Sequence, residues 1–166
     1  FIFYFDHYLM KNIIVLGATG SIGESVLSVI KQNKDELNLL GISFSSNIVK
    51  AKDIINEFKL KNVYSESDDS HEYLKHSFEN NHELNILKDK SELEELLNKD
   101  DVDIIVSAIS GFAGLESTLM ASKTGKTILL ANKESIVVAG EIIIPLAKQY
   151  NTQIIPIDSE HNAIFQ

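Results

Sequence analysis

Residues 12–23, Asn-Ile-Ile-Val-Leu-Gly-Ala-Thr-Gly-Ser-Ile-Gly (NIIVLGATGSIG), decide the fold. The segment begins with a continuous apolar run, Asn12–Leu16, which predicts a buried strand, and passes at once into a turn with three glycines. Helical spacing of apolar residues then predicts a helix over Ile22–Gln32. Strand, glycine turn and helix in direct succession are typical of the first unit of an α/β domain.

The rest of the chain alternates in the same way between apolar runs and helical patterns. Strands are predicted at Leu37–Ser45, Asn62–Ser65, Ile86–Leu87, Val102–Ile109, Thr127–Ala131 and Gln153–Ile157. Helices are predicted at Ile48–Phe58, Ser91–Asn98, Leu115–Thr124 and Gly140–Tyr150, with one more inside the polar stretch from Glu66 to Asn85. Apolar strands between helices predict a parallel sheet covered on both faces. Right-handed crossovers then favour an α/β fold with a doubly wound, Rossmann-type sheet.

Composition excludes several classes of function. The 166 residues include 15 basic and 24 acidic side chains, a net charge of −9, which argues against a nucleic-acid partner. The absence of cysteine excludes disulfides, thiolate zinc sites and cysteine nucleophiles from these residues. No run approaches the roughly 20 apolar residues of a transmembrane helix, so no membrane association is expected. The aromatic-rich residues 1–9, which precede Met10, are expected to be an extraneous leader rather than part of a targeting segment.

The three glycines of the turn have separate expected roles. Gly17 permits a tight turn, Gly20 lets the backbone approach a pyrophosphate, and Gly23 allows the helix to pack closely on the strand. Thr19 and Ser21 can add hydroxyl donors, and the helix N-terminus adds free N–H groups. We therefore predict a dinucleotide site. The alternative is a glycine turn that packs without a ligand.

The end of the second predicted strand favours NADPH over NADH. An NAD site places a carboxylate there for the ribose 2′-hydroxyl, but this chain has Phe44-Ser45-Ser46-Asn47, followed by Lys50 and Lys52. Small donors and nearby ammonium groups suit a 2′-phosphate better. An ordinary solvated helix face explains the two lysines equally well.

Two polar segments follow late strands, where open α/β sheets bind their ligands. The first is Asn132-Lys133-Glu134-Ser135, which is either the edge of a ligand site or a helix start capped by Asn132 or Ser135. The second contains Asp158 and Glu160, which share one side of the chain if it stays extended there. Two carboxylates on one side suit Mg²⁺ or Mn²⁺. A solvated acidic turn is the alternative.

Two further groups of residues carry weaker signals. The Ser110–Gly114 loop follows a predicted strand, and it either borders the cofactor or only turns the chain. His71, His76 and His82 lack the spacing of a zinc site and are predicted to be surface residues.

Taken together, GATGSIG, LANKES and PIDSEHNAIFQ make this chain similar to the 1-deoxy-D-xylulose 5-phosphate reductoisomerase family, from about Met10 to Gln166. The resemblance implies an NADPH-binding domain at residues 10–151 and the incomplete start of a catalytic domain at residues 152–166. It also implies an NADPH- and Mg²⁺- or Mn²⁺-dependent oxidoreductase of non-mevalonate isoprenoid biosynthesis. Such an enzyme isomerises and reduces 1-deoxy-D-xylulose 5-phosphate to 2-C-methyl-D-erythritol 4-phosphate.

The resemblance also implies a role for individual residues. Thr19, Gly20, Ser21 and Ile22 would hold the cofactor phosphates, Asn47 would border the adenosine end, and Asn132 and Glu134 would lie by the nicotinamide ribose. The expected metal ligands are Asp158 and Glu160, the expected substrate contacts are Lys133, Ser159 and Glu160, and the expected catalytic residues are Lys133, Asp158 and Glu160.

The chain departs from the family pattern at two places. Many members carry a Gly-Lys-Asn-like stretch where this chain has Ser45-Ser46-Asn47, so the 2′-phosphate contact is weakened unless Lys50 substitutes. The third metal carboxylate, the phosphate-binding residues, the lid and the C-terminal helical domain of the family would lie beyond Gln166. We therefore expect a fragment that is inactive by itself. At full length we expect a homodimer that binds a small sugar phosphate, in the cytoplasm of a bacterium or in a plastid.

Two other functions remain open at this point. One is another NADP-dependent Rossmann oxidoreductase, such as a semialdehyde or homoserine dehydrogenase. The other is a non-catalytic nucleotide-sensing module. The carboxylates Asp158 and Glu160 separate the hypotheses, because a sensor has no need of a metal pair.

Overall fold

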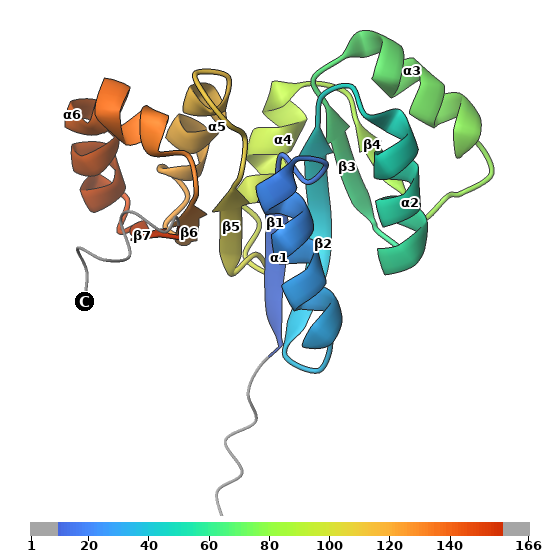
Figure 1. Cartoon of the computed structure of the whole chain (residues 1–166), viewed down its shortest axis with the longest axis horizontal. Coiled ribbons are helices and arrows are strands. Elements are labelled where there is room, and N and C mark those ends of the chain that lie inside the picture. Colours follow the sequence, from blue (N-terminus) through green and yellow to red (C-terminus); the bar gives the residue numbers. More distant parts are fainter. Residues whose placement is uncertain (1–9, 158–166) are drawn as a thin grey trace, which may run out of the picture.

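One parallel sheet forms the centre of the molecule, as the computed structural model shows for residues 10–157 (Figure 1). Its seven strands lie in the order β4-β3-β2-β1-β5-β6-β7, and every neighbouring pair is parallel. The strands are β1 (Lys11–Leu16), β2 (Leu37–Phe44), β3 (Asn62–Ser65), β4 (Asn85–Leu87), β5 (Ile104–Ser107), β6 (Thr127–Leu130) and β7 (Gln153–Pro156). The helices are α1 (Ser21–Gln32), α2 (Ile48–Phe58), α3 (Asp68–Ser77), α4 (Lys90–Leu97), α5 (Gly114–Ala121) and α6 (Lys133–Gln149). The predicted fold class is confirmed.

The chain winds outward from β1 in two directions. It first builds β2, β3 and β4 on one side of β1, and it then returns to add β5, β6 and β7 on the other side. Because each crossover is right-handed, this reversal places α1–α3 on one face and α4–α6 on the other. Two apolar cores reflect the arrangement: Leu27, Ile54 and Leu74 pack on one face of the sheet, and Leu96, Ala121 and Ile128 belong to the core on the other.

Two predictions made from the sequence are wrong in detail. The last helix begins at Lys133 rather than Gly140, because Asn132 caps it and the β-branched run that follows is helical after all. Ala139 has non-helical backbone angles (φ −134°, ψ 22°), so α6 consists of two parts joined at a kink. His71 is also not a surface residue, since it lies on the inner side of α3 with 7% of its surface exposed.

The start of β1 is tied to the start of β5 by one carboxylate. Asp103 accepts a hydrogen bond from the Asn12 backbone N–H at 2.9 Å and another from Lys11 Nζ at 3.0 Å. Partial burial opposes ionisation of this carboxyl, but the two hydrogen bonds and the positive charges of Lys11 and Lys126 together hold its pKa below the usual value. Asp103 therefore fixes the two central strands at the edge opposite the site.

We expect Asp103→Asn to lower the free energy of unfolding by about 1 kcal/mol at pH 7, because the charge-assisted hydrogen bonds to Asn12 and Lys11 are weakened. The loss stays small because the ion pair with Lys11 is partly exposed. A depressed pKa stabilises the fold above the unfolded-state pKa, and this share is lost as pH falls through the folded-state pKa. Urea unfolding from pH 7 to about pH 3 should therefore show the difference shrinking below about pH 4. The exposed Asp35→Asn is the control, and a difference independent of pH would contradict the explanation.

Candidate functional site

The reversal of winding direction opens a groove at the carboxyl ends of β1 and β5. β1 continues into α1 on one face of the sheet, and β5 continues into α5 on the other face. Open α/β sheets bind their ligands in the crevice between two such strands. A cavity of about 170 Å³ lies at this point. Its lining comes from the ends of β1, β2, β3 and β5 and from the loops after them: Gly17, Thr19, Gly20, Ser43, Phe44, Ser45, Glu66, Ala108, Ile109 and Ser110.

The glycine turn is fixed to the neighbouring strands by its backbone. Gly17 adopts φ +83°, where other residues are strained, and its N–H donates to both the carbonyl and the hydroxyl of Ser43 at 3.1 Å each. A Cβ at Gly17 would lie 2.9 Å from Ile109 Cγ1 and 3.0 Å from the Ala108 backbone. The turn therefore fits only with glycine at its first position, as the sequence predicted.

The other two glycines of the motif differ from each other. A Cβ at Gly23 would lie 2.5 Å from the Gly17 carbonyl oxygen and 2.6 Å from that of Ala18, so α1 can approach the turn only without a side chain there. A Cβ at Gly20 would meet the Gly17 oxygen at an ordinary 3.5 Å, in an extended conformation that any residue adopts. Nothing described within this chain requires glycine at position 20. That observation fits a backbone that must leave room for a ligand.

The N-terminus of α1 carries unpaired donors toward the groove. The first backbone N–H groups of a helix have no partner inside it, and the cap residue Gly20 offers no side-chain acceptor. In α2, α3, α4 and α6, by contrast, a side chain accepts a hydrogen bond from the first turn. The amides of Ser21, Ile22 and Gly23 and the helix dipole are thus arranged for an anion such as a phosphate.

The segment after β2 brings one of its two lysines to the turn. Lys50 Nζ donates to the Thr19 carbonyl oxygen at 3.0 Å and forms an ion pair with Glu24. Lys52 extends to α3 instead, with its Nζ 5.2 Å from the centroid of the Tyr73 ring. Asn47 caps α2 by accepting from the Lys50 backbone N–H at 3.2 Å. Lys50 thus contacts the glycine turn, whereas Lys52 contacts α3.

The LANKES segment lies where β6 runs into α6. The Asn132 side chain is 1% exposed, accepts from the Ser135 N–H at 3.1 Å and donates to the Gly111 carbonyl oxygen at 2.9 Å. The capping interpretation is thus confirmed for Asn132. A Cβ at Gly114 would lie 2.2 Å from Asn132 Nδ2, so the loop before α5 closes on this amide only with glycine there. Lys133 and Glu134 follow as exposed residues of the first turn of α6.

The predicted metal ligands Asp158 and Glu160 and the predicted substrate contact Ser159 lie outside the residues that the structure describes. Within residues 10–157, no group of three or more His, Cys, Asp or Glu side chains is arranged to hold a metal ion. Nor does any helix in that range have the length and apolar character needed to cross a membrane.

A carboxylate that sequence reasoning missed stands on the groove wall. Glu66 follows β3, where burial raises the pKa of its carboxyl, Lys90 opposes the shift and Glu116 adds to it. Burial also raises the pKa of the neighbouring Tyr64, and Glu66 adds to that shift. Because another negative charge is disfavoured beside Glu66, the groove wall directly after β3 suits a neutral group such as a base rather than a phosphate. Only the position of Glu66 after a strand could have indicated it.

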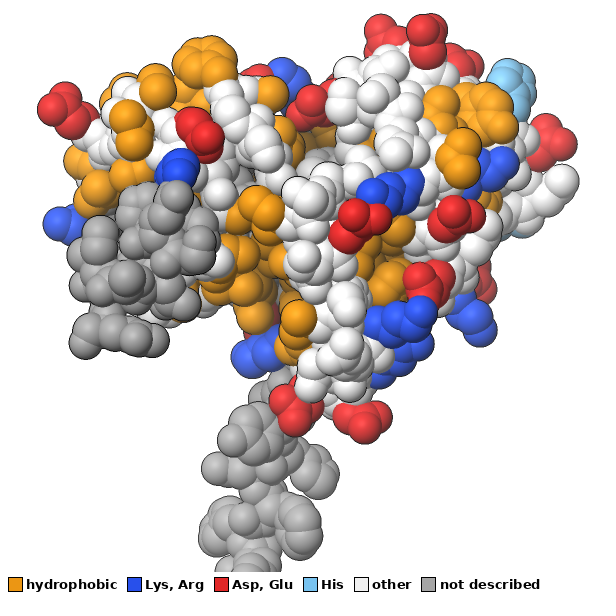
Figure 2. All heavy atoms as spheres, in the orientation of Figure 1, with side chains coloured by type: hydrophobic (Ala, Val, Ile, Leu, Met, Phe, Trp, Pro, Cys, Tyr) orange, Lys and Arg blue, Asp and Glu red, His pale blue; other side chains and the backbone are white. Residues whose placement is uncertain are grey.

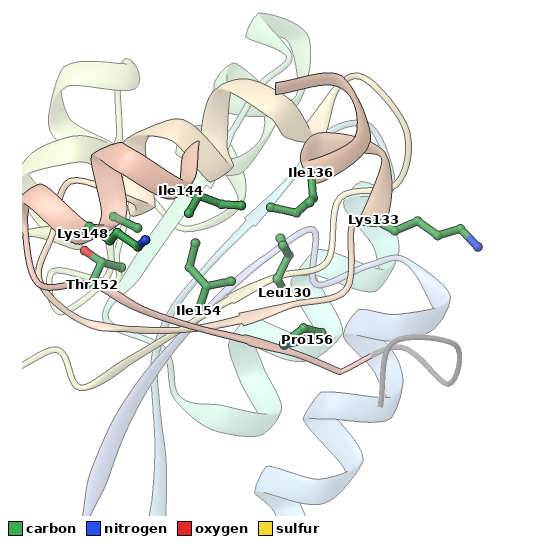
Figure 3. Close-up of a pocket in the computed structure, with 9 residues that line it drawn as sticks. Leu130, Lys133, Ile136, Ile144, Lys148, Thr152, Ile154 and Pro156 are labelled. Atoms are coloured by element: carbon green, nitrogen blue, oxygen red, sulfur yellow. The ribbon is translucent and has the colours of Figure 1, made fainter. Parts of the chain in front are cut away.

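A larger hollow of about 380 Å³ lies between α6 and the last two strands (Figure 3). Its walls are mostly aliphatic, from Leu130, Ile136, Ile144 and Ile154. Figure 3 shows the Lys133 side chain pointing away from this hollow. Nearby, the outer face of α6 exposes Val137, Val138 and Ile142, and Figure 2 shows hydrophobic side chains gathered at this end of the molecule. Lys148 and Thr152 lie at one end of the hollow, but the Thr152 hydroxyl is already bonded to Gly125 and Ser122. The glycine turn therefore remains the better candidate site.

The sequence model of the 1-deoxy-D-xylulose 5-phosphate reductoisomerase family matches residues 13–140. This match spans the glycine turn, the groove and the start of α6. The chain belongs to the 1-deoxy-D-xylulose 5-phosphate reductoisomerase family.

Several members of the reductoisomerase family show how much of the chain is shared. The reductoisomerase of Clostridium beijerinckii is 43% identical over 95% of this chain, and that of Vesicomyosocius okutanii is 38% identical over 95%. The chain spans 41% and 40% of these relatives, about two fifths of their length.

Solved reductoisomerase structures are similar in fold. One in complex with NADPH, fosmidomycin and magnesium has a TM-score of 0.88 and 40% identity, covering 95% of this chain and 38% of its own. The Zymomonas mobilis enzyme in complex with NADPH has a TM-score of 0.86 and 35% identity, covering 95% of this chain and 41% of its own.

More distant structures share the fold alone. A homoserine dehydrogenase from Thiobacillus denitrificans is 18% identical, with a TM-score of 0.52, and covers 88% of this chain and 29% of its own. A 3-ketoreductase from Actinomadura kijaniata is 13% identical, with a TM-score of 0.59, over 94% of this chain and 41% of its own. Membership of the reductoisomerase family therefore replaces the alternative of another Rossmann oxidoreductase.

We expect Gly23→Ala to lower the free energy of unfolding by about 2–3 kcal/mol, because its methyl group would collide with two backbone carbonyls. Gly140→Ala is the matched control, since a Cβ there meets only side-chain atoms at 3.5 and 3.9 Å. The control should leave stability unchanged or raise it by up to about 1 kcal/mol. Urea unfolding of both variants measures the difference, and equal effects would refute this account of the turn.

Proposed function

We propose that this chain supplies the NADPH-binding part of a 1-deoxy-D-xylulose 5-phosphate reductoisomerase. Such an enzyme isomerises and reduces its substrate to 2-C-methyl-D-erythritol 4-phosphate, with NADPH and a divalent metal ion. The observation that carries the proposal is the glycine turn beside the groove at which the winding of the sheet reverses, the switch point of the sheet. There, Gly20 lacks a side chain although its own chain would have space for one. Family membership and the NADPH complexes of the similar structures support the same function.

The cofactor would lie across the groove, with its pyrophosphate on the turn. The backbone of Thr19, Gly20, Ser21 and Ile22 would hold the phosphates, with Gly17 and Gly23 shaping the turn. Asn47 would border the adenosine end. Asn132 would act by holding the loop at Gly111, since both functional groups of its amide are engaged, and Glu134 would lie by the nicotinamide ribose.

The remaining assignments concern the reacting groups. Lys133 and Ser159 would contact the substrate, and Asp158 and Glu160 would hold Mg²⁺ or Mn²⁺. When bound, NADPH supplies a hydride and the metal ion acts as a Lewis acid on the substrate oxygens. The described residues bind and orient the dinucleotide.

The domain division and the assembly are also proposals. Residues 10–151 would form the cofactor domain and residues 152–166 the start of the catalytic part. The sheet itself continues through β7 at Gln153–Pro156, so the division concerns function and not a break in the sheet. We further propose a homodimer at the full family length, without a nucleic-acid partner, in a bacterial cytoplasm. The relatives named above are bacterial.

NADPH binding by the purified chain tests the proposed function. Titration with NADPH, followed by cofactor fluorescence, should saturate. Gly20→Ala should weaken binding at least about tenfold, because a methyl group would separate the phosphates from the helix N-terminus. The same variant should keep its free energy of unfolding within about 1 kcal/mol of the wild type, because its Cβ fits. No binding by the folded wild-type chain would contradict the proposal, as would unchanged affinity in Gly20→Ala.

The metal assignment has a separate test in a protein that carries this chain at the full family length. Asp158→Asn should abolish Mn²⁺-dependent oxidation of NADPH by deoxyxylulose phosphate, because a neutral amide is a poor ligand for a hard cation. NADPH affinity should stay within about twofold, since the carboxylate is assigned to the metal and not to the cofactor. An equal loss of cofactor binding would mean that Asp158 has another role.

A further inference from the structure

We infer that Lys50 binds the 2′-phosphate of the cofactor and so determines the preference of this chain for NADPH over NADH. The inference rests on the proposed function, because it concerns the adenosine end of the same dinucleotide. It adds a specificity-determining residue that the glycine motif does not contain.

The position of Lys50 carries the first part of the argument. It lies in the first turn of α2, directly after the corner that follows β2, and its Nζ reaches the Thr19 carbonyl at 3.0 Å. Its side chain thus joins the two segments between which the adenosine ribose of a dinucleotide lies in this fold, the glycine turn and the end of the second strand. A 2′-phosphate placed there would be within reach of this ammonium group.

The surrounding residues leave this role to Lys50. The corner from Ser45 to Asn47 offers neutral donors and has no carboxylate that would accept from a ribose 2′-hydroxyl. Among the described residues, the neighbouring lysines are engaged elsewhere. Lys52 lies over the Tyr73 ring, and Lys31 forms an ion pair with Glu57.

The ion pair with Glu24 holds the Lys50 ammonium group in position before a phosphate binds. Glu24 keeps the Lys50 ammonium beside the turn, and both side chains are accessible, at 30% exposed for Lys50 and 53% for Glu24. A phosphate carries more negative charge and more acceptor oxygens than one carboxylate, so it competes well for the lysine. The Glu24 carboxylate is free to turn to water. Glu24 therefore positions Lys50 but also opposes the phosphate by its own charge.

Cofactor affinities of the whole 166-residue chain test this inference. NADPH and NADH are titrated separately into the wild type, Lys50→Met, Lys50→Arg and the matched control Lys52→Met. Lys50→Met should weaken NADPH binding about ten- to a hundredfold, the range of a charge-assisted hydrogen bond, and change NADH binding less than about twofold. Lys50→Arg should restore most of the NADPH affinity. Lys52→Met should leave both affinities within about twofold.

Glu24→Gln adds an independent measurement. Removal of the competing carboxylate should strengthen NADPH binding severalfold and leave NADH nearly unchanged. Equal losses of NADPH and NADH affinity in Lys50→Met, without rescue by arginine, would show that Lys50 only supports the turn and would overturn the inference. Unchanged NADPH affinity in Lys50→Met would overturn it as well. A wild-type chain that binds neither cofactor would contradict the proposed function itself, and this inference with it.

Discussion

The close contact between the glycine turn and the start of α1 is the constraint on which the site depends. Gly23 allows this helix to lie against the Gly17 and Ala18 carbonyls, and Gly17 turns the chain over the end of β5. With the helix in that place, its free N–H groups face the crevice where the winding of the sheet reverses. One backbone arrangement thus fixes the fold at its centre and the anion site at its edge.

The sequence predicted the fold well because the strands and helices of this fold are marked by local patterns of apolar residues. Buried strands such as Asn12–Leu16 are continuous apolar runs, and right-handed crossovers then leave few topologies open. It was wrong at two places. The last helix was predicted to begin at Gly140, but Asn132, one of the two possible caps, begins α6 at Lys133. His71 lies in a polar stretch, but α3 turns it inward.

The candidate site could be predicted only in part, for a related reason. Gly17, Gly20 and Gly23 form a motif in one continuous segment, so spacing reveals them. Ser43 and Glu66 reach the site from separate elements, and no local motif marks them. Lys50 and Lys52 look alike in the sequence. Only the packing of α2 shows that the first reaches the turn and the second reaches α3.

Amide chemical shifts during a titration of the chain with NADPH test the central claim most directly, that the turn at the switch point holds the dinucleotide. The account predicts the largest changes at Thr19–Gly23 and at Ala108–Ser110 on the opposite side of the groove, with little change in the edge strand β4. Changes concentrated around Ile144 and Ile154 in the apolar hollow, with the turn unaffected, would contradict it.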